Sequence, residues 1–111
     1  MTAKRTVPKR EKVVDQTLYL SGKRRGALLK EEVWYEGGRV VKYSLAYINP
    51  RVCGVDNGRV LGYDNAHDHH RRHFMGKLEE FEFRGYEALV VKFERKVQAL
   101  WKAEDGNEKK R

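Results

Sequence analysis

The sequence predicts an α+β fold: a small antiparallel β-sheet, arranged as a hairpin-based meander, covered by a C-terminal amphipathic α-helix. Two long segments of alternating apolar residues flank the pair Gly37-Gly38, which is typical of a tight hairpin turn. Near the end of the chain, apolar residues recur at helical spacing. Because a sheet and a helix of this kind each bury one apolar face, we expect them to pack against each other.

Residues 27–36 and 39–48 form the predicted hairpin. In the first segment apolar and charged residues alternate. In the second, one face carries an apolar row made up of Val41, Tyr43, Leu45 and Tyr47. Asn49-Pro50 should end this strand pair, because proline has no N–H to donate to a ladder.

Shorter extended segments are predicted at 51–55 and 60–64, on either side of an Asp-Asn-Gly turn at 56–58 whose residues tolerate positive φ. A further short strand is predicted at 80–83, where two phenylalanines alternate with charged residues. Residues 12–20 fit a short helix and an additional strand equally well.

The C-terminal helix is predicted over residues 86–102, directly after Gly85. Its apolar stripe consists of Leu89, Val90, Phe93, Val97, Leu100 and Trp101. This stripe should pack on one face of the antiparallel sheet.

At 111 residues and 13.1 kDa the chain fits a single domain. We expect residues 13–103 to form it, between a basic flexible arm (1–12) and a polar flexible tail (104–111). No apolar run is long enough for a membrane-spanning helix, and no secretory signal is visible, so no membrane partner is expected. The single cysteine, Cys53, excludes an internal disulfide, and a cytoplasmic location is the simplest expectation.

The formal net charge is +8 and the sequence pI is about 9.7. An excess of this size on a small domain attracts acidic partners over long range. Nucleic acid is the commonest such partner, and an acidic region of another protein is the next. The sequence leaves open whether RNA or DNA is bound and whether the chain forms a homodimer.

All four histidines of the chain, His67, His69, His70 and His73, lie within seven residues, directly after the predicted strand 60–64. Imidazole gives and takes protons near neutral pH, and the neighbouring arginines are suited to clamping phosphate. A helical turn from residue 68 onward would place His69 and His73 on one face, with His70 and His73 nearly as close. The segment therefore predicts two imidazoles within reach of one ligand.

Three interpretations of these histidines remain open. In the first, one histidine takes the proton of an RNA 2′-hydroxyl and another protonates the leaving oxygen, while Arg71 or Arg72 neutralises charge on the phosphorane; no metal or other cofactor is needed. In the second, a divalent metal is bound by Asp64, His69 and His73, although the spacing matches no standard zinc signature and two guanidinium groups would oppose a dication. In the third, the segment is a histidine-rich polar loop without a dedicated ligand.

Three neighbouring residues also have two interpretations each. Tyr63 either donates to a phosphate oxygen or stacks on a base, or it is a strand tyrosine half in the core. Asp64 either orients an imidazole or closes a turn beside Asn65. Arg59 either tracks a phosphate backbone or is only solvated.

The segments Gly58–His67 and His69–Phe74 resemble the TumE-like toxin family, whose pattern is a strand ending in Tyr-Asp-Asn-Ala, a histidine-rich stretch and a C-terminal helix. The resemblance spans about residues 27–102. It implies the toxin component of a bacterial or archaeal toxin–antitoxin pair, neutralised by a helix-turn-helix antitoxin protein. Carried onto this chain, the motif positions are Tyr63, Asp64, Asn65, His67, His70 and His73.

The leading hypothesis from the sequence is therefore a ribonuclease-type toxin that uses histidine acid–base chemistry on RNA phosphodiesters. The residues assigned to catalysis are His67, His70, His73, Asp64 and Tyr63. The residues assigned to substrate binding are Arg71, Arg72, Arg59 and Asn65. Two alternatives stay open: a non-enzymatic, basic nucleic-acid-binding module whose histidines only tune affinity, and a metal-dependent nuclease with aspartate and histidine ligands.

Overall fold

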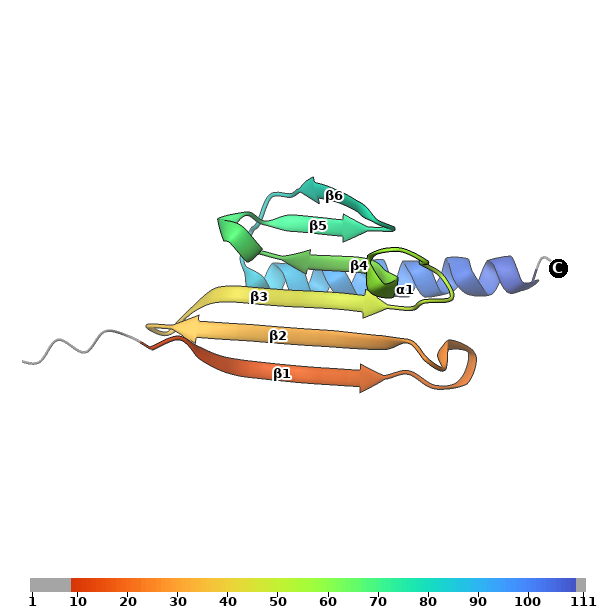
Figure 1. Ribbon diagram of the computed structural model, residues 1–111, viewed down its shortest axis with the longest axis horizontal. Helices are drawn as coiled ribbons and strands as arrows, with labels where there is room; N and C mark the ends of the chain where they lie inside the picture. The colour runs from red at the N-terminus through yellow and green to blue at the C-terminus, as the bar shows by residue number, and fades with distance from the viewer. Residues whose placement is uncertain (1–8, 110–111) are drawn as a thin grey trace, which may run out of the picture.

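The computed structural model describes residues 9–109 of the chain. Six antiparallel strands form one sheet, and their spatial order is their order along the chain (Figure 1). The strands are β1 (Glu11–Tyr19), β2 (Leu28–Glu36), β3 (Arg39–Ile48), β4 (Arg59–Asp64), β5 (Arg71–Phe74) and β6 (Lys77–Glu80). Short 3-10 helices η1 (Gly22–Arg24), η2 (Asp56–Gly58) and η3 (Ala66–Asp68) lie in the connections. The predicted antiparallel meander is confirmed.

The helix α1 (Tyr86–Lys109) lies behind the sheet in Figure 1 and packs against β3. The stripe residues Leu89, Phe93 and Val97 are buried in the core, as the helical spacing predicted. Their partners in the sheet are Tyr43, Leu45, Tyr47, Leu61 and Tyr63. Full burial of each such side chain stabilises the fold by about 1.5–3 kcal/mol, so this interface contributes substantially to stability.

The two faces of the sheet therefore differ, and we call them the helix side and the open side. Tyr43 and Tyr63 point to the helix side, where Tyr43 contacts Tyr86 and Tyr63 contacts Phe93. Their neighbours in the strands alternate, so Asp64 points to the open side.

A β-bulge in β4 decides which side chains reach the open side. Leu61 pairs with Tyr47 and Arg59 pairs with Ile48, so Val60 is an extra residue in β4. Val60 and Leu61 are both fully buried. As a result Arg59 lies on the open side together with Asp64, which strict alternation along β4 would not have allowed.

The hairpin predicted over 27–36 and 39–48 is confirmed as β2 and β3, and both glycines of its turn have positive φ. The segment 12–20, which fitted helix or strand, is extended, and the edge strand β1 covers Glu11–Tyr19. Residues 51–55 do not form the predicted extended segment. The Asn49 carbonyl accepts the N–H groups of both Val52 and Cys53, which closes a turn instead.

The strand predicted at 80–83 lies three residues earlier in the chain, because β6 covers Lys77–Glu80. Met75 and Gly76 both have positive φ, of 49° and 83°, and they close a tight hairpin between β5 and β6. This hairpin also overturns the expected helical turn after Asp68, because residues 71–74 pair with β4 on one side and with β6 on the other.

The ends of the ordered domain differ from the predicted boundaries. The strand β1 begins at Glu11, inside the expected arm 1–12, and α1 continues through most of the expected tail 104–111. Arg24 holds this last part of the helix, donating to the Trp101 carbonyl (3.0 Å) and to Asp105 (3.1 Å). Residues 1–8 and 110–111 lie outside the described part of the chain. Within the described part, no helix combines the length and apolar character needed to cross a membrane.

Candidate functional site

His73 lies on the open side of the sheet, in a network of charged side chains. Its Nε2 donates to Asp64 Oδ2 over 2.8 Å, and its Nδ1 accepts from Arg59 Nη2 over 3.0 Å. Arg59 in turn makes two bonds to Asp56, of 2.8 and 3.0 Å. Both nitrogens of the His73 ring are therefore occupied by protein groups, and neither is available to a substrate in this arrangement.

The backbone around His73 is shaped to hold this network. A Cβ atom at Gly62 would lie 2.7 Å from Arg59 Cδ, so the absence of a side chain there lets Arg59 cross the strand toward His73. Arg59 also holds the pKa of Asp56 below its usual range, mainly through their hydrogen bonds. The interaction ties the 56–58 turn to β4 and β5.

Asp64 and Asn65 connect three strands at the end of β4. Besides accepting from His73, Asp64 accepts the backbone N–H of Ala66 over 3.1 Å. The Asn65 side chain accepts the N–H of Tyr43 (3.0 Å) and donates to the carbonyl of Val41 (2.9 Å). Its amide thus continues the ladder beside β3. The structure gives Asn65 a role in strand pairing, and both ends of its amide are used.

His70 lies on the helix side, among aromatic rings. Its ring stacks on Phe83 with centroids 4.2 Å apart and planes 4° from parallel, and it contacts Phe81 edge-on. Its Nδ1 is 2.7 Å from the hydroxyl of buried Tyr43. Its Nε2 is neither buried nor bonded to another described residue, so it can reach a ligand.

The electrostatics of this second histidine favour a neutral ring. Partial burial lowers the pKa of His70, so the imidazole is uncharged at neutral pH. Burial, with a smaller contribution from the charge of Asp64, raises the pKa of Tyr43 well above that of a free tyrosine. Tyr43 therefore stays protonated and can hold His70 Nδ1 in one orientation. A neutral, oriented imidazole with an accessible nitrogen can serve as a general base.

The remaining histidines are solvent-facing. His67 is exposed in η3 and has a left-handed backbone (φ 60°). His69 is exposed and lies 3.6 Å from the carboxylate of Glu80. Among the described residues, no group of three or more histidine, cysteine, aspartate or glutamate side chains is arranged to hold a metal ion, so Asp64, His69 and His73 are not brought together as ligands.

The expected convergence of the histidines is therefore not found. His70 and His73 point to opposite faces of the sheet, because the segment is a strand and positions three apart in a strand face opposite ways. His67 and His69 make no contact with either ring among the interactions of the described residues. One phosphate cannot lie between His70 and His73, and a two-histidine relay through this pair is wrong.

The other predicted site residues also lie apart, either in the core or on different sides of the sheet. Tyr63 is fully buried between Phe81 and Phe93, so its alternative interpretation as a core residue is the one that the structure supports. Arg71 is half-buried next to Asp64 on the open side. Arg72 points to the helix side, where it pairs with Glu79 and lies over the Phe74 ring. The two arginines therefore do not act on the same group.

A second feature, which the sequence did not reveal, runs between α1 and the β5–β6 side of the sheet. Two hollows of about 440 and 230 Å³ follow one another along the helix, and we call them together the basic groove. The cations that line it are Arg72, Arg84, Lys92, Arg95 and Lys96, and the one acidic lining residue is Glu82. Phe81 lines the larger hollow and also contacts the His70 ring edge-on, so His70 is separated from the groove by one aromatic ring.

The helical spacing contains a signal for this groove. Lys92 and Lys96 are four residues apart and Arg95 is adjacent to them, so all three lie on one flank of the predicted helix. No sequence pattern marked which strands would face that flank. Tyr43, the partner of His70, carried no signal beyond its place in an apolar row.

Comparisons of the chain with protein-family models, with curated proteins and with solved structures found no match. The chemistry of the basic groove and of His70 therefore carries the functional conclusion.

The lowered pKa of His70 predicts a specific pH dependence of stability. Because the folded pKa lies below the unfolded value near 6.5, the unfolded chain binds more protons at mildly acidic pH. The contribution is fully present above about pH 6.5 and is lost as pH falls through the folded pKa. We expect wild type to lose more unfolding free energy than His70→Gln between about pH 7.5 and pH 5 in urea titrations. His69→Gln, at an exposed position, is the control. An equal loss in wild type and His70→Gln would contradict the assignment.

Proposed function

We propose that this chain is an RNA-cleaving toxin of a toxin–antitoxin pair, which binds the RNA backbone in the basic groove and uses His70 for proton transfer. The observation that carries the proposal is a neutral imidazole with one accessible nitrogen, which shares the Phe81 ring with a groove lined by five cations and one acid. Two of the cations, Arg72 and Arg84, are paired with Glu79 and Glu82, and the other three, Lys92, Arg95 and Lys96, lie on α1. A basic groove supplies the sequence-independent affinity of nucleic-acid binding. The resemblance of the Tyr-Asp-Asn-Ala and histidine segments to TumE-like toxins supports the physiological role.

The groove suits a single strand. Lys92 and Lys96 are separated by about 6 Å along the helix axis, a spacing comparable to that of successive phosphates in an extended strand. Lys92 also lies over the rings of Tyr63 and Phe81, at 5.8 and 5.5 Å, so its charge is held toward the groove. Phe81 offers a partly exposed aromatic edge beside these cations, where a base can pack.

His70 would act as the base in cleavage. With hydrogen on Nδ1 bonded to the Tyr43 oxygen, Nε2 accepts the proton of the 2′-hydroxyl, and the 2′-oxygen attacks the adjacent phosphorus. The bond to the 5′-oxygen breaks, this oxygen takes a proton from water, and the imidazolium returns its proton to solvent. The products are a 2′,3′-cyclic phosphate and a 5′-hydroxyl. The cations of the groove neutralise the charge that develops on the phosphorane.

A second candidate is a basic RNA-binding module without catalysis. One observation favours it: the motif residues Asp64, Asn65 and His73 are engaged in strand pairing and in the Arg59 network, so the motif is accounted for by the fold. Both functions use the basic groove, but only the toxin cleaves the RNA that it binds. End-group analysis of RNA after incubation with EDTA-treated protein separates them. Intact RNA supports the binding module, and a cyclic phosphate supports the toxin.

The basic groove predicts the salt dependence of RNA binding. Each phosphate contact on a single strand contributes about 0.7 to the slope of log affinity against log salt. We therefore expect Lys92→Gln with Lys96→Gln to reduce this slope by about 1.4, as measured by fluorescence anisotropy with a labelled single-stranded RNA. The control is Lys23→Gln with Arg25→Gln, which removes the same charge from the exposed η1 connection. Equal losses in the two double variants would show that the groove is not the binding surface.

A further inference from the structure

The edge strand β1 is long and exposes apolar side chains, in contrast to the other edge of the sheet. It has nine residues, and Val13, Leu18 and Tyr19 are 47%, 60% and 76% exposed. The opposite edge, β6, has four residues, three of them charged. An exposed strand edge carries unpaired N–H and C=O groups, and short or charged edges are the usual protection against pairing. In β1 the register irregularity and two of the three charged residues lie at its start, between Glu11 and Val14, so residues 14–19 form a regular edge with Asp15 as its one charge.

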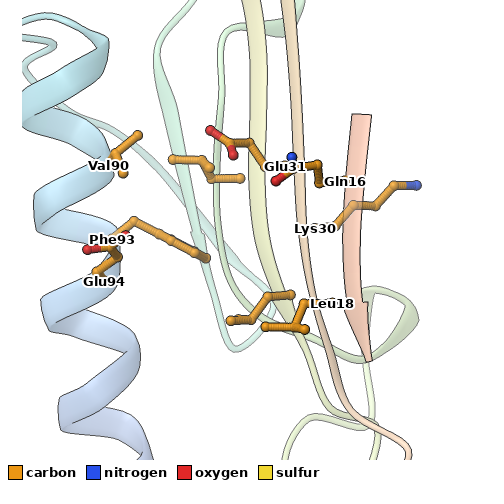
Figure 2. Close-up of a pocket in the computed structure, with 9 residues that line it drawn as sticks. Gln16, Leu18, Lys30, Glu31, Val90, Phe93 and Glu94 are labelled. Carbon is orange, nitrogen blue, oxygen red and sulfur yellow. The ribbon is translucent and has the colours of Figure 1, made fainter. Parts of the chain in front are cut away.

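The surface beside β1 is apolar as well. The helix α1 lies behind the middle of the sheet and leaves β1 uncovered (Figure 1). Between the helix and the strands β1 and β2 is a hollow of about 190 Å³. Figure 2 shows Leu18 of β1 on one side of it and Val90 and Phe93 of α1 on the other. Val91 of the same helix is 49% exposed.

We propose that two copies of this chain pair through β1, antiparallel and with the two-fold axis at Gln16, to form one continuous sheet. This inference concerns assembly and does not depend on RNA binding. In this register Val14 lies opposite Leu18 of the second copy, and Asp15 lies opposite Thr17. A shift of the axis to Asp15 would place the two Asp15 carboxylates opposite each other, which is unfavourable. The register at Gln16 avoids like charges and joins apolar side chains on the helix side.

The high net charge of the chain does not oppose this dimer. The cations of the basic groove lie on the β5–β6 flank of α1, while the hollow on the flank toward β1 is lined by two acids, Glu31 and Glu94, and one cation, Lys30. Strands are spaced by about 4.8 Å, so the β6 edges of the two copies would be separated by roughly 50 Å. The Debye length at physiological salt is only about 8 Å, and the two grooves are therefore screened from each other.

Cysteine cross-linking at the axis tests the register. Because only the residue on the axis meets its own copy, Gln16→Cys should form a disulfide-linked dimer under mild oxidation, and Thr17→Cys should not. The native Cys53 is buried and does not interfere. Equal cross-linking at both positions, or at neither, would overturn the proposed register.

Two variants with opposite charges at the exposed position 17 test the assembly itself. Their dimer dissociation constants are measured by sedimentation equilibrium. Thr17→Lys places a cation opposite Asp15 of the second copy, and Thr17→Asp places a second carboxylate there, each twice per dimer. We expect the dimer dissociation constant to fall in the first variant and to rise in the second, by about 2- to 30-fold each. Leu78→Lys on β6 is the control and should leave it unchanged. A protein that remains monomeric at about 100 μM would overturn the dimer and leave the β1 edge to a different protein partner.

Discussion

His70→Gln is expected to reduce RNA cleavage by about 100- to 10,000-fold, the usual contribution of a positioned general base. Nε2 of His70 is the accessible nitrogen of a ring that stacks on Phe83 and is oriented by Tyr43. Glutamine is of similar length and cannot take a proton at neutral pH. RNA affinity should change little, because the cations of the basic groove remain. The measurement is single-turnover cleavage of a labelled RNA, with growth arrest in cells as a second readout.

The other histidines supply the controls for this experiment. His69→Gln changes an exposed ring beside Glu80 and should cleave RNA at the wild-type rate. Treatment with EDTA should also leave the rate unchanged. Wild-type cleavage by His70→Gln would remove His70 from the mechanism, and loss of activity with EDTA would favour the metal-dependent alternative.

Asp64→Ala is expected to lower the free energy of unfolding by about 2–4 kcal/mol. The substitution removes the acceptor for His73 Nε2 and for the N–H of Ala66. It also removes the carboxylate that lies 3.8 Å from Arg59 Nη1. Asp64 is only 16% exposed, so water replaces these partners incompletely. Urea denaturation followed by circular dichroism measures the change.

Asp68→Asn is the control, because Asp68 is exposed, makes no ion pair with another described residue, and asparagine tolerates its left-handed backbone (φ 61°). Its unfolding free energy should stay within about 0.5 kcal/mol of wild type. His73→Gln should follow Asp64→Ala in stability, whereas His70→Gln should affect cleavage far more than folding. If His73→Gln were as stable as wild type, the network on the open side would not be the structural element described above.

The fold was largely predictable because its signals are local. Alternation over residues 27–48 with Gly37-Gly38 between the segments specified a hairpin, and the spacing of Leu89, Phe93 and Val97 specified a helix with one buried face. The errors lie where local signals are weak. The turn at Met75-Gly76 has a residue with positive φ that is neither glycine nor asparagine, and it was therefore missed.

The candidate site was less predictable, for a physical reason. The positions of His70 and His73 along the chain are local facts, but the side of the sheet that each ring faces depends on whether the segment is a helix or a strand. Pairing of residues 71–74 with β4 and β6 made it a strand and separated the two rings. The bulge at Val60 then brought Arg59 to His73, where the Arg59 guanidinium occupies Nδ1 of the His73 ring and excludes a ligand from it.

Composition and periodicity alone determined a small basic α+β domain whose four histidines lie in one segment, because net charge and apolar spacing are properties of the chain itself. The choice of a single accessible imidazole, and the basic groove beside it, came from contacts between α1 and strands distant in sequence. Such contacts depend on strand register and on the helix flank that faces the sheet, and a single sequence specifies neither of them locally.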